Sequence, residues 1–87
     1  MPLVRVRGPL KRLAGDRSEH ALEGRTVDEL LRALEHAHPD TSGWILDECG
    51  KLRRHINVFV NGEPVEQQAL VGHADRVDVL PAISGGR

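Results

Sequence analysis

The sequence has few aromatic residues and no excess of either charge. Trp44 and Phe59 are its only tryptophan and phenylalanine, and tyrosine is absent. Because proteins that bind single-stranded nucleic acid stack bases on several aromatic faces, this composition argues against a nucleic-acid partner. Twelve lysines and arginines against 13 aspartates and glutamates give a net charge of −1. No overall positive field would therefore attract the chain to nucleic acid or to anionic lipid.

Cysteine is nearly absent as well. The single thiol of Cys49 cannot form an internal disulfide, and it excludes zinc and iron–sulfur sites that need four thiolates. We expect Cys49 to be a partly buried structural thiol. The five histidines are scattered along the chain, and His36 and His38 would point about 200° apart on a helix. We therefore expect solvated histidines, no metal site and no bound cofactor.

Long hydrophobic runs are also missing. The N-terminus lacks the continuous apolar segment of an export signal, and no 18 consecutive residues are apolar. We therefore expect a cytoplasmic protein with no membrane partner. Its 87 residues, 39% of them apolar, are enough for one small globular domain.

Apolar and polar residues alternate in several short segments, which is the pattern of half-buried β-strands. The predicted strands are residues 3–7, 17–23, 55–60, 63–66 and 76–80. Asn61-Gly62 is a strong hairpin signal between the third and the fourth of them. Pro64 suits only an edge strand, because proline has no backbone N–H to donate. Residues 10–13 fit neither a strand nor a helix clearly.

The clearest predicted element is a helix that begins after Thr26. Thr26 is a good N-cap, and Glu29 three residues later completes a capping box. Four apolar residues recur at helical spacing on one face, namely Val27, Leu30, Leu31 and Leu34. Pro39 ends the helix. Between this helix and the third strand we expect an apolar flap over the core edge, formed by Trp44, Ile45, Leu46 and Leu52.

The element order predicts an α+β protein in which one helix covers a sheet of four or five strands. If the first and last strands pair in parallel, the mixed sheet closes around the helix in the β-grasp (ubiquitin-like) arrangement. We expect this domain to span residues 1–81 and a flexible tail to span residues 82–87. The strand valines would face the helix, whereas Leu3, Phe59 and Leu80 would face away from it.

The predicted tail carries the most unusual sequence feature. It consists of Ala82, Ile83, Ser84, Gly85, Gly86 and Arg87. A glycine pair accepts almost any backbone conformation and would thread a narrow enzyme channel. A glycine carboxylate is unhindered, but it is ionised at neutral pH and must become an acyl-adenylate before a sulfur or amine nucleophile attacks it. The alternative interpretation is a frayed terminus, where small residues are common.

Two ordered blocks in the C-terminal half resemble the ubiquitin-like bacterial sulfur carriers. The blocks are RHINVFVNGE at residues 54–63 and DRVDVLPAISGG at residues 75–86. That family includes the small subunit of molybdopterin synthase, the thiamine sulfur carrier, and the carrier of a thiocarboxylate-dependent cysteine synthesis. The lead-in at residues 50–54 and the pair Pro81-Ala82 look closest to the cysteine-pathway carrier.

The resemblance implies a β-grasp carrier that is not itself an enzyme. A ubiquitin-activating-type partner would use ATP and Mg²⁺ to adenylate the carboxylate of Gly86. A sulfur donor would then convert it to a thiocarboxylate, and the sulfur would pass to a biosynthetic enzyme. Mature family members end at the second glycine, so Arg87 departs from the pattern. We therefore expect a trimming protease to cleave between Gly86 and Arg87.

The residues that we expect to contact the partner enzymes are Phe59, Leu80, Leu3 and Arg54. A single helix covers one face of the sheet, so apolar side chains on the other face would stay available to a partner. The alternative is a set of scattered apolar residues, which is normal on any protein surface. The basic cluster in residues 51–54 is either a solvated rim or a surface that steers an acidic partner.

Three other functions stay open at the level of sequence. The activated glycine would make the chain a ubiquitin-like modifier if it formed an amide with a lysine. The chain would instead be the small subunit of molybdopterin synthase if its tail carried sulfur within a stable complex. The third alternative is a β-grasp interaction module whose tail is never activated.

Overall fold

The computed structural model describes residues 1–81, and its elements follow the predicted order with one short helix and one 3-10 turn added. The elements are β1 (Leu3–Val6), α1 (Pro9–Leu13), β2 (Glu19–Ala21), α2 (Val27–Ala37), η1 (Pro39–Thr41), β3 (Ile56–Val60), β4 (Glu63–Pro64) and β5 (Arg76–Pro81). The predicted tail, residues 82–87, lies outside the described residues, so its flexibility stays a prediction. In residues 1–81 we find no helix of the length and apolarity that a bilayer span requires.

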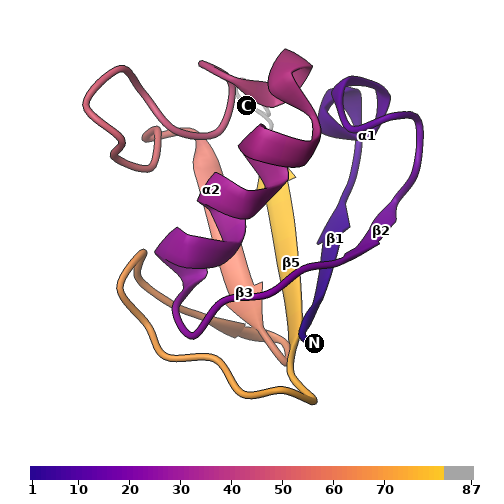
Figure 1. The fold of residues 1–87 in the computed structure, drawn as a ribbon. Helices are drawn as coiled ribbons and strands as arrows, with labels where there is room; N and C mark the ends of the chain where they lie inside the picture. Colours follow the sequence, from indigo (N-terminus) through magenta and orange to yellow (C-terminus); the bar gives the residue numbers. More distant parts are fainter. Residues whose placement is uncertain (82–87) are drawn as a thin grey trace.

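The five strands form one mixed sheet in the order β2-β1-β5-β3-β4. β1 pairs antiparallel with β2 and parallel with β5, and β5 pairs antiparallel with β3. Figure 1 shows α2 lying across one face of this sheet, with β5 between β1 and β3. The α+β class, the β-grasp arrangement and the parallel pairing of the first and last strands are therefore confirmed.

The alternating valines and the stripe on α2 meet to form the core. On the sheet the buried apolar side chains are no more than 4% exposed, and they are Val4, Val6, Ile56, Val58, Val77 and Val79. On α2 the fully buried side chains are Val27, Leu30, Leu31 and Leu34, as the helical spacing predicted. Apart from His20 on β2, sheet and helix thus bury aliphatic groups between them, which the period of each element dictates.

The N-terminus of α2 is capped by its own sequence. The hydroxyl of Thr26 accepts a hydrogen bond from the Glu29 backbone N–H at 3.2 Å. The Glu29 carboxylate accepts from the backbone N–H of Arg25 at 2.8 Å, one residue earlier than in a standard capping box. The helix ends at Ala37, because Pro39 starts the 3-10 turn η1.

Residues 10–13, which the sequence left undecided, belong to helix α1. Gly8 precedes the helix with a positive φ of 64°, and Pro9 occupies its first position. Leu10 is buried in the core at 2% exposure. Five residues are too short for an autonomous helix, so contact with the core, rather than local propensity, selects this one.

The predicted hairpin is present, but its return strand is shorter than the sequence suggested. Asn61 and Gly62 both take positive φ angles, 51° and 85°, as the two-residue type I′ turn requires. β4 ends at Pro64 rather than at residue 66. Val65 still donates its N–H to the Val58 carbonyl at 3.0 Å.

The flap prediction was right for three residues and wrong for Trp44. Ile45 and Leu46 are buried and Leu52 packs against the core, whereas Trp44 is 52% exposed. The prediction for Cys49 was also wrong, because this thiol is exposed on the loop that follows. A backbone turn around a neighbouring carboxylate holds that loop outside the core, and periodicity cannot reveal such a turn.

The prediction of solvated histidines was wrong for His20. This residue is 7% exposed, because β2 turns it to the same face as the core valines of β1. Its Nε2 donates a hydrogen bond to the carbonyl of Arg17 at 2.8 Å. Its ring meets the ring of His38 edge-on, with the ring centroids 4.9 Å apart. Tertiary pairing therefore joins two histidines that the sequence places 18 residues apart.

Candidate functional site

The site is organised around the end of β5, where the chain continues toward the diglycine. Pro81, the last described residue, pairs with Ile56 at the start of β3. The turn at Gly8 lies against it, since a Cβ on Gly8 would stand 3.6 Å from Cγ of Pro81. The predicted site of activation, Gly86, and the predicted cleavage site before Arg87 lie outside the described residues.

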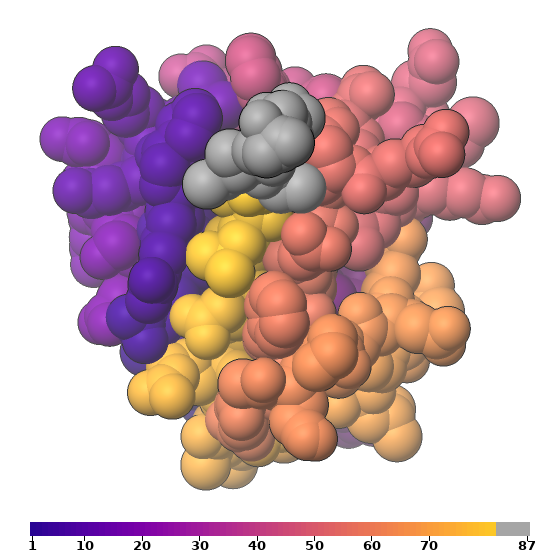
Figure 2. All heavy atoms as spheres, turned by 180° about the vertical axis from the view of Figure 1, so that it is seen from behind, coloured from indigo at the N-terminus to yellow at the C-terminus, as the bar shows by residue number. Residues whose placement is uncertain are grey.

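The sheet face opposite α2 holds the two apolar residues predicted to contact a partner. Figure 2 shows this face, with β5 in yellow between indigo β1 and salmon β3 and no helix over it. Phe59 pairs across the strands with Asp78, and Leu80 is the next residue on the same side of β5. Such diagonal neighbours lie within reach of an aromatic side chain. Phe59 and Leu80 are both half-buried, and we call them the open-face pair.

The other two predicted contact residues are placed differently. Leu3 pairs with Arg76, four residues before Leu80 along β5, a separation of about 13 Å along the strand. Leu3 is therefore not part of the cluster. Arg54 is exposed in the turn before β3, at the same end of the sheet as Pro81. The structure thus groups Arg54 with the end of β5 and leaves Leu3 at the far end of the open face.

An ion pair that the sequence reading missed crosses the open face beside Phe59. Arg5 Nε lies 3.6 Å from Oδ1 of Asp78 and 3.8 Å from Oε2 of Glu19. Oδ1 of Asp78 is buried and has no hydrogen-bond partner within residues 1–81. The sequence did indicate the position of Arg5, because the alternation that predicts Leu3 on the open face also predicts Arg5 there. The register that sets Asp78 opposite Phe59 was not readable from the sequence.

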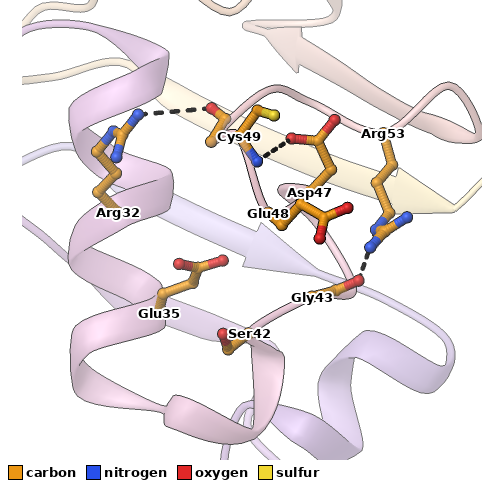
Figure 3. A pocket seen from close by; sticks show the side chains of 9 residues that line it. Arg32, Glu35, Ser42, Gly43, Asp47, Glu48, Cys49 and Arg53 are labelled. Atoms are coloured by element: carbon orange, nitrogen blue, oxygen red, sulfur yellow. Dashed lines mark hydrogen bonds between the residues drawn. The ribbon is translucent and has the colours of Figure 1, made fainter.

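A groove of about 510 Å³ separates α2 from the loop after η1. In Figure 3, Arg32 and Glu35 project from α2, and Asp47, Cys49 and Arg53 are on the facing loop. Its remaining lining residues are Ser42, Gly43, Glu48 and Gly50. Arg32 donates to the Gly50 carbonyl at 3.5 Å, and Cys49 donates its N–H to Asp47 at 2.8 Å.

The electrostatics of the groove stabilise the loop. The backbone N–H of Lys51, together with that of Cys49, lowers the pKa of Asp47. Partial burial raises the pKa of Glu35, and the nearby Arg32 opposes that shift. Across residues 1–81, no three His, Cys, Asp or Glu side chains converge as a metal ion would require. The groove therefore braces one loop against α2, and the open-face pair and the end of β5 remain the candidate site.

The fold and this site define a class of protein, a ubiquitin-like β-grasp domain whose last strand continues into a diglycine sequence. The sequence pattern of the ThiS family matches residues 4–86. The chain therefore belongs to the ThiS family, as its resemblance to the bacterial sulfur carriers predicted.

Named relatives agree with this assignment. Small archaeal modifier protein 1 of Haloferax volcanii is 36% identical over 61 residues, which cover 70% of each chain. The sulfur carrier protein CysO of Mycobacterium tuberculosis is 30% identical over 78 residues, covering 83% of this chain and 84% of CysO. A chain in the crystal structure of the Amycolatopsis orientalis BexX/CysO complex superposes with a TM-score of 0.88 at 31% identity, covering 99% of this chain and 100% of that one. The protein is thus similar both to sulfur carriers and to a ubiquitin-like modifier.

Proposed function

We propose that this protein is a sulfur carrier whose activated group is the carboxylate of Gly86. The observation that carries the proposal is the ThiS-family match, which runs through the last strand and includes both glycines of the diglycine. In this role the chain is a co-substrate and its partners perform the catalysis. Because activation consumes ATP, we place the protein in the cytoplasm.

The proposed chemistry has three balanced steps. The Gly86 carboxylate attacks the α-phosphorus of Mg·ATP on an adenylating enzyme of the ubiquitin-activating type, and pyrophosphate leaves. The terminal sulfur of a persulfide donor attacks the carbonyl carbon, AMP leaves, and an acyl disulfide forms. A second thiol attacks the donor's sulfur, so the sulfur–sulfur bond breaks and the carrier keeps a thiocarboxylate while the two thiols form a disulfide. Because the first step needs a free carboxylate on Gly86, Arg87 must be removed before it.

The geometry at the end of β5 supports delivery of this group to an enzyme. Five residues, 82–86, follow Pro81, and an extended chain of that length reaches about 17 Å. The open-face pair lies directly before this segment, so an enzyme that takes up the tail has an apolar surface to bind beside it. We therefore propose Phe59 and Leu80, with Arg54, as the contact surface for the adenylating and sulfur-accepting enzymes.

Cysteine synthesis is the pathway that we favour for the sulfur. The similarity to CysO over 78 residues supports this choice. A sulfur-accepting biosynthetic enzyme would bind the thiocarboxylate form and take its sulfur. The BexX/CysO complex of Amycolatopsis shows that a similar carrier assembles with a second protein. Sulfur incorporation into cysteine, measured with the purified thiocarboxylate form, tests the pathway separately from the activation step.

A second candidate function is conjugation to lysine. It is supported by the similarity to small archaeal modifier protein 1. In this case the activated carbonyl of Gly86 forms an amide with a lysine amine, and AMP leaves. The mass spectra of conjugates would show the diglycine attached to target lysines. If only thiocarboxylate and no conjugate formed in cells, the modifier function would be excluded.

The decisive experiment compares three forms of the chain, which end at Gly85, Gly86 or Arg87. Each is mixed with the adenylating enzyme from the same genome, Mg·ATP and labelled pyrophosphate. We expect ATP–pyrophosphate exchange only with the form that ends at Gly86, and replacement of one oxygen by sulfur in its intact mass after a persulfide donor is added. Equal exchange with the form that ends at Arg87 would overturn the trimming step. No exchange with any form would favour an interaction module, and a stable complex with a larger synthase would favour a molybdopterin synthase subunit.

A further inference from the structure

Trp44 is exposed although the residues on both sides of it are anchored. Thr41 is fully buried, and its hydroxyl donates to the carbonyl of His38 at 2.8 Å. The N–H of Trp44 donates to the carbonyl of Thr41 at 3.0 Å, and Ile45 is again fully buried. The indole therefore stands 52% exposed on a backbone held at both ends. Binding a partner here would cost little ordering of the loop.

The indole lines a shallow hollow of about 250 Å³ together with Gly43, Arg53 and His55. Arg53 donates from Nε to the carbonyl of Gly43 at 2.5 Å, and its backbone N–H donates to the carbonyl of Ile45. The bond from Nε to Gly43 is the only side-chain hydrogen bond of Arg53 within residues 1–81, and none of the ion pairs there includes its guanidinium. The terminal nitrogens of Arg53 thus remain available next to the exposed ring of Trp44.

The hollow lies at the same end of the sheet as the exit of the chain. His55 directly precedes Ile56, and Ile56 is the Cα partner of Pro81. A stable complex buries about 800 Å² on each partner, equivalent to a disc of about 16 Å radius. An interface of this size is wide enough for an enzyme that binds the five residues after Pro81 to reach the hollow.

We propose that the hollow of Trp44, Arg53 and His55 binds an acidic segment of the adenylating enzyme, with an apolar side chain against the indole and a carboxylate on Arg53. The inference rests on the proposed function, because it concerns the partner that activates Gly86. It adds a second contact to the contact at Phe59 and Leu80.

The charges around the hollow determine the chemistry of the occupant. No acidic residue lines it, whereas Arg53 does and the exposed Arg54 follows directly in the chain. The nearest acids along the chain, Asp47 and Glu48, line the groove between α2 and the loop, which Arg53 also lines, and the charge of Arg53 contributes to the lowered pKa of Asp47. Tryptophan and arginine are also the side chains that most often dominate binding energy at interfaces. An acidic, apolar segment therefore complements the hollow better than a basic one.

The single tryptophan makes the contact directly observable. Because Trp44 is the only tryptophan, the form of the chain that ends at Gly86 gives one ¹⁹F resonance after labelling with 5-fluorotryptophan. We expect this resonance to shift or broaden when the unlabelled adenylating enzyme is added with Mg·ATP. An unchanged resonance at enzyme concentrations that saturate exchange would overturn the inference.

Substitutions test the energy of the contact. We expect Trp44→Ala and Arg53→Gln each to raise the KM for the carrier in ATP–pyrophosphate exchange about tenfold, with kcat unchanged. Trp44→Phe should restore most of the loss. Leu70→Ala is the matched control, since Leu70 is 80% exposed elsewhere on the molecule, and its KM should stay within about twofold.

The outcomes separate the inference from the proposed function. If the parent chain supports exchange and Trp44→Ala has the parent KM, the hollow is not a contact and the carrier function stands. If the parent chain supports no exchange, the carrier function fails and the inference fails with it. A raised KM for Trp44→Ala and Arg53→Gln, with Leu70→Ala unaffected, supports both.

Discussion

The two faces of the sheet differ in what they carry. On the face covered by α2, the side chains of β1, β3 and β5 are aliphatic, and all but those at the ends of β3 and β5 are almost fully buried. On the open face, the same strands mix apolar residues with polar and charged ones, and Arg5 reaches across to Asp78 beside Phe59. The covered face therefore supplies most of the burial that stabilises the fold, while the open face keeps side chains that a partner can desolvate.

This difference separates stability from recognition in one small domain. A chain of this size buries a smaller fraction of its surface on folding than a large domain does, so the loss of a few core contacts would destabilise it. The proposed contact residues Phe59 and Leu80 lie on the opposite side of the same strands, so substitutions there should not open a cavity in the core. Substitutions on the two faces should accordingly affect different measurements.

The largest expected effect is a loss of stability on the covered face. Leu34 is fully buried between α2 and the sheet, so Leu34→Ala should lower the free energy of unfolding by about 2–5 kcal/mol. Urea denaturation followed by circular dichroism measures this loss. Leu70→Ala, at an 80% exposed position, should change stability by less than about 0.5 kcal/mol. If Leu34→Ala and Leu70→Ala lowered the free energy of unfolding by similar amounts, the covered face would not be the main source of stability.

The second effect should appear in binding rather than in stability. Phe59→Lys should raise the KM for the carrier in ATP–pyrophosphate exchange by about tenfold, because it removes the aromatic contact of the open-face pair. Lysine is the better choice than aspartate, since Phe59→Asp would set a second carboxylate directly opposite Asp78. The unfolding free energy should fall by about 1 kcal/mol at most. If Phe59→Lys left the KM unchanged and lowered the free energy of unfolding as much as Leu34→Ala, the open face would serve stability rather than binding.

The smallest effect concerns the loop at the margin of the covered face. The Asp47 carboxylate accepts the N–H groups of Lys51 and Cys49, which lowers its pKa in the folded state. Because the pKa of Asp47 is lower in the folded state than its unfolded value of about 3.9, the ionised carboxylate stabilises the folded state at pH values above about 3.9. This contribution is lost as the pH falls through the pKa of the folded state. Asp47→Asn should therefore lower the urea midpoint slightly at pH 7, and the difference should shrink below about pH 4. A difference that is the same at pH 7 and pH 3 would exclude this origin.

Local patterns predicted most of the fold. The strands alternate with period two, the α2 stripe follows the helical period, and Thr26 and Glu29 cap the helix, so each element was predictable from neighbouring residues alone. The short helix α1 was not predictable, because the burial of Leu10 against distant residues selects it. The return strand was predicted too long, since it ends at Pro64 and alternation does not show where pairing stops.

The candidate site was predictable only in part. Alternation correctly turned Phe59 and Leu80 to the open face, and those two residues do lie as diagonal neighbours. It could not show that Leu3 lies far from them, because strand register is a property of pairing rather than of spacing. The exposure of Trp44 was also missed, since apolar neighbours suggested a buried flap.

The sequence by itself determined the diglycine segment, the amphipathic faces and the order of the elements, because each depends on residues a few positions apart. The tertiary structure alone decided that Asp78 faces Phe59, that His20 meets His38, and that Trp44 lines a hollow together with His55. Such neighbours arise when strands pair in one register and loops close over the core. The register and the loop positions depend on how the whole domain buries its apolar side chains, so they cannot be predicted from a short segment of the sequence.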